Sequence, residues 1–233
     1  MAVPKHPAAD NRFPPIGSYG FLSDCHTSAL VSFAGSIEWL CLPRFDSPSA
    51  FGALLDRDAG HFSLGPRDVI VPISRRYEPG TLVIETTWVT DTGWVVVHDA
   101  LTIGEWVPDG AGGRPRTEHE SDNSLLRTIT CIDGEVLFDM ECRPRFGYAA
   151  EHATWSGGEL GEATATCDDG SQLLLTSDME LSVSESASGL DQRASVGFGV
   201  GRKYRPNLLA ICRLQEVAVA IAFGRPRVAA TFE

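Results

Sequence analysis

The sequence lacks the segments that would carry a protein to or through a membrane. Residues 1–15 contain a single lysine and no apolar core, which does not fit a secretory signal. No uncharged apolar run approaches the roughly 18 residues that span a bilayer. We therefore expect a cytoplasmic protein that does not contact membranes.

Positive charge is also scarce. The chain carries 19 basic and 31 acidic residues, a net charge of −12. Proteins that bind nucleic acid gather lysine and arginine to neutralise phosphates, whereas no uninterrupted run of basic residues here is longer than a pair such as Arg75 and Arg76. Nucleic acid is therefore not expected as a partner.

Known catalytic and metal-binding motifs are missing as well. There is no nucleophile elbow, Walker loop, HExxH helix or dinucleotide-binding fingerprint, and the six cysteines include no CxxC spacing. Most of the cysteines lie in apolar, strand-like runs, which is typical of buried, reduced thiols. The sequence thus indicates no catalytic residue, no metal ligand and no cofactor.

What the sequence does contain is a series of strand patterns. Residues 28–42 hold two β-rich runs around a Gly-containing turn, and residues 81–101 hold a second pair around Asp91-Thr92-Gly93. From 136 to 142, apolar residues alternate with mostly charged ones, the pattern of a strand with one buried face. No convincing amphipathic helix of 12 or more residues precedes residue 206. We expect an all-β fold, a large antiparallel β-sandwich of the supersandwich type.

Composition divides the chain into three parts. Residues 1–13 are expected to be a flexible N-terminus, residues 14–193 the sandwich, and residues 194–233 a divergent basic tail that holds six basic and two acidic residues. Within the tail, residues 206–223 fit either a short helix or a strand, so the tail is predicted as a short helix or an irregular segment. Residues 108–123 are rich in glycine, proline and charge, which predicts an exposed loop.

The segment with most chemical character follows the strand that ends near residue 42. Trp39 is followed by Arg44, Phe45 and Asp46 in a loop stiffened by two prolines. A carboxylate and a guanidinium can bond vicinal sugar hydroxyls, while an aromatic ring covers the apolar face of a pyranose. In the alternative interpretation, which the spacing alone favours, Arg44 pairs with Asp46 and Phe45 fills the core.

His98 and Asp99 form a second candidate, an acid–base pair. Because the two residues are adjacent on a predicted strand, their side chains should point to opposite faces. The pattern therefore favours a structural role for both.

Two blocks of the sequence resemble the start of glycoside hydrolase family 15, in its bacterial trehalase and glucoamylase-like branch. They are residues 16–31 (IGSYGFLSDCHTSALV) and 35–48 (GSIEWLCLPRFDSP), with weaker matches at 75–82 and 142–148. The resemblance covers about residues 14–190 and is to the trehalase-like N-terminal domain. Gly147 and Ser18 depart from it, because the family commonly has acidic residues at these positions.

The resemblance implies a fold and a role. In this family an N-terminal β-sandwich packs on an (α/α)6 barrel, whose two glutamates hydrolyse α-glucosidic bonds with inversion. A barrel of twelve helices needs on the order of 200 residues, and from about residue 195 the chain shows no family pattern. The resemblance therefore implies the non-catalytic domain without its barrel. Trp39, Arg44, Phe45 and Asp46 would then contact a trehalose- or maltose-type α-glucoside only when a barrel is present.

Other interpretations of the same sequence stay open. The chain fits a free-standing sandwich that binds carbohydrate or another protein, and it also fits a truncated gene product without activity. A shifted reading frame in a GC-rich gene would produce a tail of this composition. A sandwich without its barrel would expose an apolar surface through which we expect self-association.

Overall fold

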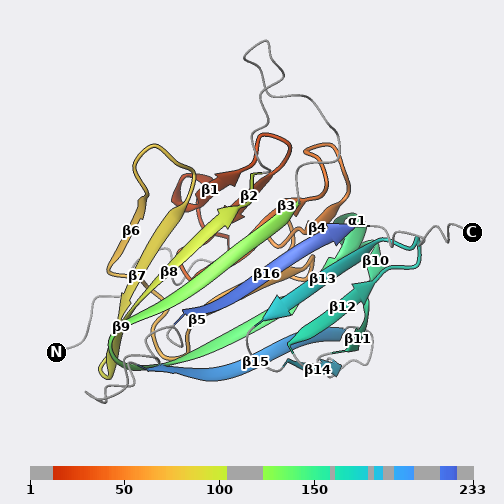
Figure 1. The fold of residues 1–233 in the computed structure, drawn as a ribbon. Coiled ribbons are helices and arrows are strands. Elements are labelled where there is room, and N and C mark those ends of the chain that lie inside the picture. Colours follow the sequence, from red (N-terminus) through yellow and green to blue (C-terminus); the bar gives the residue numbers. More distant parts are fainter. Residues whose placement is uncertain are drawn as a thin grey trace, which may run out of the picture.

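A computed structural model describes residues 13–103, 123–157, 161–177, 181–185, 192–201 and 216–224. These residues form a β-structure in two layers (Figure 1). The strands are β1 (Gly20–Ser23), β2 (Ser28–Val31), β3 (Ser36–Cys41), β4 (Ser49–Phe51), β5 (His61–Pro66), β6 (Ser74–Tyr77), β7 (Ile84–Val89), β8 (Gly93–Leu101), β9 (Ser124–Arg143), β10 (Glu151–His152), β11 (Thr154–Gly157), β12 (Glu162–Thr166), β13 (Gln172–Ser177), β14 (Ser182–Glu185), β15 (Gln192–Gly201) and β16 (Glu216–Gly224). A 3-10 turn at Ile16–Ser18 and the four-residue α1 (Phe146–Ala149) complete the described elements.

The long strand β9 belongs to both layers. Its first half pairs with β8 and β16, and its second half pairs with β5 and β15. The change occurs at Gly134, where φ is 69°. A Cβ atom at this position would lie 2.1 Å from the carbonyl oxygen of Thr92. Glycine is therefore the residue that allows β9 to pass from one layer to the other.

Every pairing between the strands that the structure describes is antiparallel. The first layer contains β1 to β5, the second half of β9, β15 and β14, and the second contains β6 to β8, the first half of β9, β16, β13, β12 and β11. The expected all-β, sandwich-like architecture is confirmed. The described part of the chain contains no helix long and apolar enough to cross a bilayer.

Both predicted hairpins are present, as β2–β3 and β7–β8. The alternation from 136 to 142 is also confirmed, since Val136, Phe138, Met140 and Cys142 are buried while Leu137 is 47% exposed. The alternating segment 136–142 is part of the second half of one long strand, β9, which begins at Ser124.

The structure describes only part of the segments whose secondary structure the sequence pattern did not decide. Residues 216–224 form the strand β16, which pairs with β9 and β13, so the strand interpretation is correct for this stretch. β15 likewise extends into the basic tail, as far as Gly201, and pairs with β9. All but one residue of the predicted flexible N-terminus at 1–13 and of the predicted loop at 108–123, and all of residues 206–215, lie outside the described residues.

All five cysteines within the described residues are free. Cys41, Cys131, Cys142 and Cys167 are buried, as expected for thiols in strand-like runs. Cys25 is exposed, which corrects that expectation for one residue. It lies in the turn after β1 with φ of 71°, and not in a strand.

A buried arginine connects the two layers. Arg127, on the first half of β9, donates from Nε to Oδ1 of Asp99 on β8 at 2.7 Å, and both side chains are 0% exposed. Its Nη1 and Nη2 donate to the carbonyl oxygens of Phe62 and Gly35, at 3.0 and 2.6 Å. These two carbonyls belong to the first layer. The guanidinium therefore holds the layers together while its charge is compensated by Asp99.

Removing the carboxylate of Asp99 should destabilise the fold strongly. In Asp99→Ala, Arg127 stays buried without a counter-charge, so we expect the free energy of unfolding to fall by about 3–5 kcal/mol. The matched control is Asp139→Ala, which breaks the exposed pair between Arg67 and Asp139 on the same sandwich. Urea unfolding of both variants measures the difference, and similar losses in the two would contradict the role given to Arg127.

Candidate functional site

The loop between β3 and β4 is a short, internally bonded turn. It begins with a cis peptide bond between Leu42 and Pro43. The backbone N–H of Arg44 donates to Oγ of Ser47, and the N–H of Ser47 donates back to the carbonyl of Arg44, both at 3.1 Å. The N–H of Phe45 donates to the carbonyl of His26 at 3.0 Å, which ties the loop to the β1–β2 turn. The loop tip is thus held in one conformation by the scaffold beneath it.

The side chains at the tip point to solvent. Arg44 and Asp46 pair through Nε and Oδ1 at 3.0 Å, with side-chain exposures of 66% and 76%. The Arg44 guanidinium holds the pKa of Asp46 below its ordinary value. Phe45 is 55% exposed and therefore does not fill the core. One half of the alternative interpretation is correct, the ion pair, and the other half is wrong.

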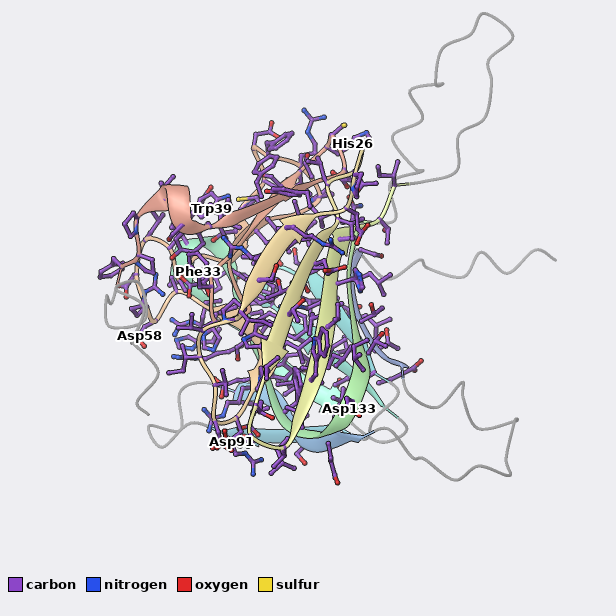
Figure 2. The ribbon with its side chains drawn as sticks, turned by 90° about the vertical axis from the view of Figure 1, so that its left-hand side faces the viewer. His26, Phe33, Trp39, Asp58, Asp91 and Asp133 are labelled. Atoms are coloured by element: carbon purple, nitrogen blue, oxygen red, sulfur yellow. The ribbon has the colours of Figure 1, made fainter. Side chains whose placement is uncertain are left out.

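Trp39 occupies a different environment. It lies on β3, half-buried, and its ring packs on Tyr148 with centroids 6.1 Å apart and a tilt of 41°. Tyr148 has φ of 60° and its N–H donates to Oγ of Ser49 at 3.0 Å. Figure 2 shows Trp39 apart from His26, the residue to which the loop is bonded. The structure therefore brings Arg44, Phe45 and Asp46 together and leaves Trp39 separate.

A groove of about 550 Å³ lies beside the loop. Pro43 and Pro48 form part of its wall, together with Phe146, Glu151 and Asp169. These residues come from the β3–β4 loop, from α1 and β10, and from the turn between β12 and β13. The sequence pattern identified the prolines as stiffening residues but did not indicate that they line a cavity.

The course of β9 explains why the groove forms here. Asn123, which precedes β9, and Phe146, which follows it, both line the groove. Because β9 changes layer at Gly134, its two ends return to the same end of the molecule. Figure 2 shows Asp91 and Asp133 at the opposite end from His26. The loops that leave the two layers therefore meet around one groove.

A polar cluster contributes Glu151 and Asp169 to the lining of this groove. Ligand atoms of Glu151, Cys167 and Asp169 lie within 4.8 Å of one another. Burial raises the pKa of the Cys167 thiol to about 11, and the thiol donates to the Glu151 carboxylate. Asp169 accepts hydrogen bonds from the N–H and the hydroxyl of Ser171 at 2.7 and 2.9 Å. The groove thus combines carboxylate acceptors with the apolar surface of proline and phenylalanine. The sequence Asp168-Asp169-Gly170 is typical of a turn, and by itself it does not indicate a groove.

His98 and Asp99 do not form an acid–base pair. Asp99 is buried against Arg127, whereas His98 lies on the outer face of β8 near Glu78 and Glu85. The predicted orientation to opposite faces is confirmed, and Asp99 has a structural role.

The fold and the groove define a β-sandwich domain with a loop-built recess at one end. Within this class the sequence identifies one family, because the family described as trehalase-like, N-terminal, matches residues 8–165. The chain belongs to that family. The resemblance of residues 16–31 and 35–48 to the trehalase-like N-terminal domain is thereby confirmed.

Similar proteins include three trehalases. The chain is 47% identical to a trehalase of Mycolicibacterium smegmatis over 206 residues, which is 83% of this chain and 30% of the relative. It is 50% identical to a trehalase of Mycobacterium tuberculosis over 173 residues, or 71% and 25% of the two chains. Identity to trehalase 1 of Sulfolobus acidocaldarius is 45% over 86 residues, or 37% and 15%. The chain therefore spans less than a third of the length of these relatives.

Proposed function

We propose that this chain is the non-catalytic N-terminal β-sandwich of a glycoside hydrolase of the trehalase type, in glycoside hydrolase family 15. The observation that carries the proposal is the match of residues 8–165 to the trehalase-like N-terminal family, in relatives that are more than three times longer than the matched region. Hydrolysis of the α-glucosidic bond would then belong to a part of the protein outside these 233 residues.

The groove supports a non-catalytic role. Inverting hydrolysis needs two carboxyl groups roughly 6.5–9.5 Å apart, so that the substrate and a water molecule fit between them. The ligand atoms of Glu151 and Asp169 lie within 4.8 Å of each other, on one wall. The Glu151 carboxylate also accepts a hydrogen bond from the Cys167 thiol. This pair is too close for an acid and a base on opposite sides of a sugar.

The exposed loop supports a contribution to substrate binding. Arg44, Phe45 and Asp46 form a rigid lip whose side chains face solvent, with Trp39 on the adjoining strand. We place a trehalose- or maltose-type α-glucoside against this lip when the catalytic barrel is present. The lip would then contact the part of the sugar that projects from the barrel.

Further elements of the proposal follow from the composition. The five free cysteines of the described residues suit a reducing compartment, and we assign the protein to the cytoplasm. The partners are the sugar and the catalytic barrel, with neither nucleic acid nor membrane. Without the barrel, the surface that it would cover favours self-association.

The isolated chain should have no glycosidase activity. We expect purified protein incubated with trehalose or maltose to release no glucose above a blank without protein. The M. smegmatis trehalase serves as the positive control in the same assay. Glucose release that rises in proportion to the concentration of this chain would contradict the proposal.

The lip should affect substrate binding in an intact enzyme. In a chimera that carries this chain in place of the matching N-terminal region of the M. smegmatis trehalase, Phe45→Ala should raise KM for trehalose roughly two- to tenfold through the lost ring contact. Trp94→Ala is the control, because Trp94 is also an exposed aromatic residue, 45% against 55% for Phe45, and it pairs with Asp133 at the end of the molecule opposite the loop. Equal KM values for the two variants would contradict the lip.

A second candidate function is a sandwich that binds carbohydrate by itself. The groove beside the lip favours this second function, because carboxylates and apolar prolines line it together. This candidate predicts heat of binding for trehalose, maltose or glucose in calorimetry on the isolated chain, and loss of that heat in Asp169→Ala. The leading proposal predicts no measurable heat with any of the three sugars.

A further inference from the structure

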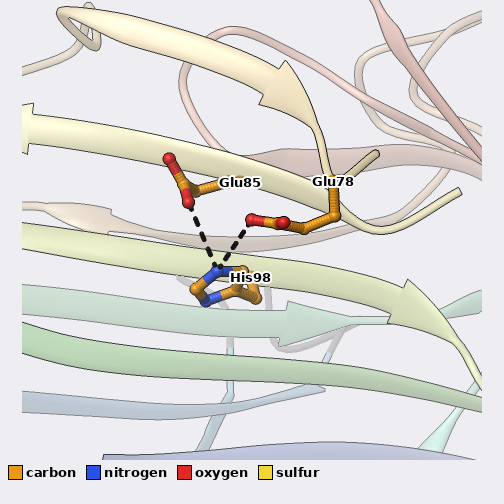
Figure 3. A group of neighbouring side chains, drawn as sticks. All are labelled: Glu78, Glu85 and His98. Carbon is orange, nitrogen blue, oxygen red and sulfur yellow. Dashed lines mark ion pairs between the residues drawn. The ribbon is translucent and has the colours of Figure 1, made fainter. Parts of the chain in front are cut away.

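Three side chains with metal-ligating atoms converge on the outer face of the second layer, and none of them lines the groove. His98 Nε2 lies 3.8 Å from Oε1 of Glu78 and 3.7 Å from Oε2 of Glu85. Figure 3 shows both carboxylates directed at the imidazole. One ligand atom from each of the three residues lies within 4.8 Å of the other two.

The backbone holds these side chains in place. Glu85 on β7 is directly opposite His98 on β8, so their Cβ atoms are roughly 4.5–5.5 Å apart on the same face. Glu78 follows β6 in a bonded turn, in which its N–H donates to the carbonyl of Val83 at 2.9 Å and its own carbonyl accepts from Thr81. The cluster therefore comes from three positions of a hydrogen-bonded hairpin.

Arg76 on β6 orients one of the carboxylates. Its Nε and Nη2 donate to Oε1 and Oε2 of Glu85, both at 2.9 Å. The guanidinium holds the pKa of Glu85 below its ordinary value, which keeps the carboxylate ionised. A carboxylate has about four lone-pair positions, so a bidentate arginine leaves acceptor positions free for a cation. Carboxylates that bind metal ions in proteins usually accept such a hydrogen bond from a neighbouring residue.

We propose that Glu78, Glu85 and His98 bind a divalent transition-metal ion of the Zn²⁺ type, through Nε2 and one oxygen of each carboxylate. Tetrahedral Zn²⁺ with bonds of 2.0–2.1 Å places its ligand atoms roughly 3.3 Å apart. The observed N–O separations of 3.7 and 3.8 Å need side-chain movements below about 0.5 Å to reach that spacing. Imidazole favours zinc and its neighbours over magnesium or calcium.

The site would be structural and independent of the sugar-binding role. In the described residues β6 pairs only with β7, so this strand is an edge of the second layer. An ion bound by Glu78, Glu85 and His98 would connect the β6–β7 turn to β7 and β8. Because the three side chains are partly exposed, a water molecule can occupy the fourth coordination position of the ion.

The test is Zn²⁺ titration of the full chain, freed of any affinity tag, by isothermal calorimetry. We expect His98→Gln and Glu78→Gln each to remove one equivalent of binding or to weaken it at least about tenfold, as loss of even an outer partner does at metal sites. The matched control is His61→Gln, because His61 Nε2 lies 3.4 Å from a single carboxylate, that of Glu141. This variant should bind Zn²⁺ as the unmodified chain does.

Two further measurements separate this site from other donors. Cys167→Ser removes the thiol of the cluster beside the groove and should leave the equivalent that depends on His98 unchanged. The imidazole nitrogens of His98 should shift on Zn²⁺ addition in a nitrogen-detected NMR experiment, while urea unfolding without metal should show that His98→Gln remains folded. The proposal is overturned if the chain binds no Zn²⁺, if binding survives His98→Gln, or if the loss follows Cys167→Ser instead.

Discussion

The buried contact between Arg127 and Asp99 is the constraint on which the two-layer structure depends. A sandwich is held mostly by apolar packing, which is non-directional and does not by itself fix how one layer is placed over the other. The Arg127 guanidinium removes that freedom because it donates to Asp99 in its own layer and to the carbonyls of Gly35 and Phe62 in the other. An arginine suits this task because its donors form a planar, rigid fork. The relative position of the layers is therefore set by directed hydrogen bonds.

The same arrangement positions the groove. Arg127 lies on β9, whose two halves belong to different layers and whose ends both approach the groove, at Asn123 and Phe146. A fixed relation between the layers consequently fixes the relation between the β3–β4 loop and the turn that carries Asp169. The rigid scaffold thus presents a lip and a recess together, as loops on a fixed framework do at binding sites.

Much of the fold was predictable from local patterns. The hairpins β2–β3 and β7–β8, the alternation from 136 to 142 and the opposite faces of His98 and Asp99 all follow from period-two patterning and turn residues, which act over a few neighbouring positions. The β9 strand was only half recognised, because a glycine in the middle of a run signals a turn as readily as a strand that changes layer. Within the tail, β16 could not be distinguished from a helix until its pairing with β9 and β13 was seen.

The candidate sites show where such prediction ends. The sequence alone determined the family and the strand series and favoured the ion pair of Arg44 and Asp46, because each depends on residues close together in the chain. Only the tertiary structure decided that Phe45 faces solvent, that Glu151 and Asp169 share a wall, and that Glu85 faces His98. The reason is physical: these relations depend on strand register and on the passage of β9 between layers, which bring together side chains that no local spacing connects.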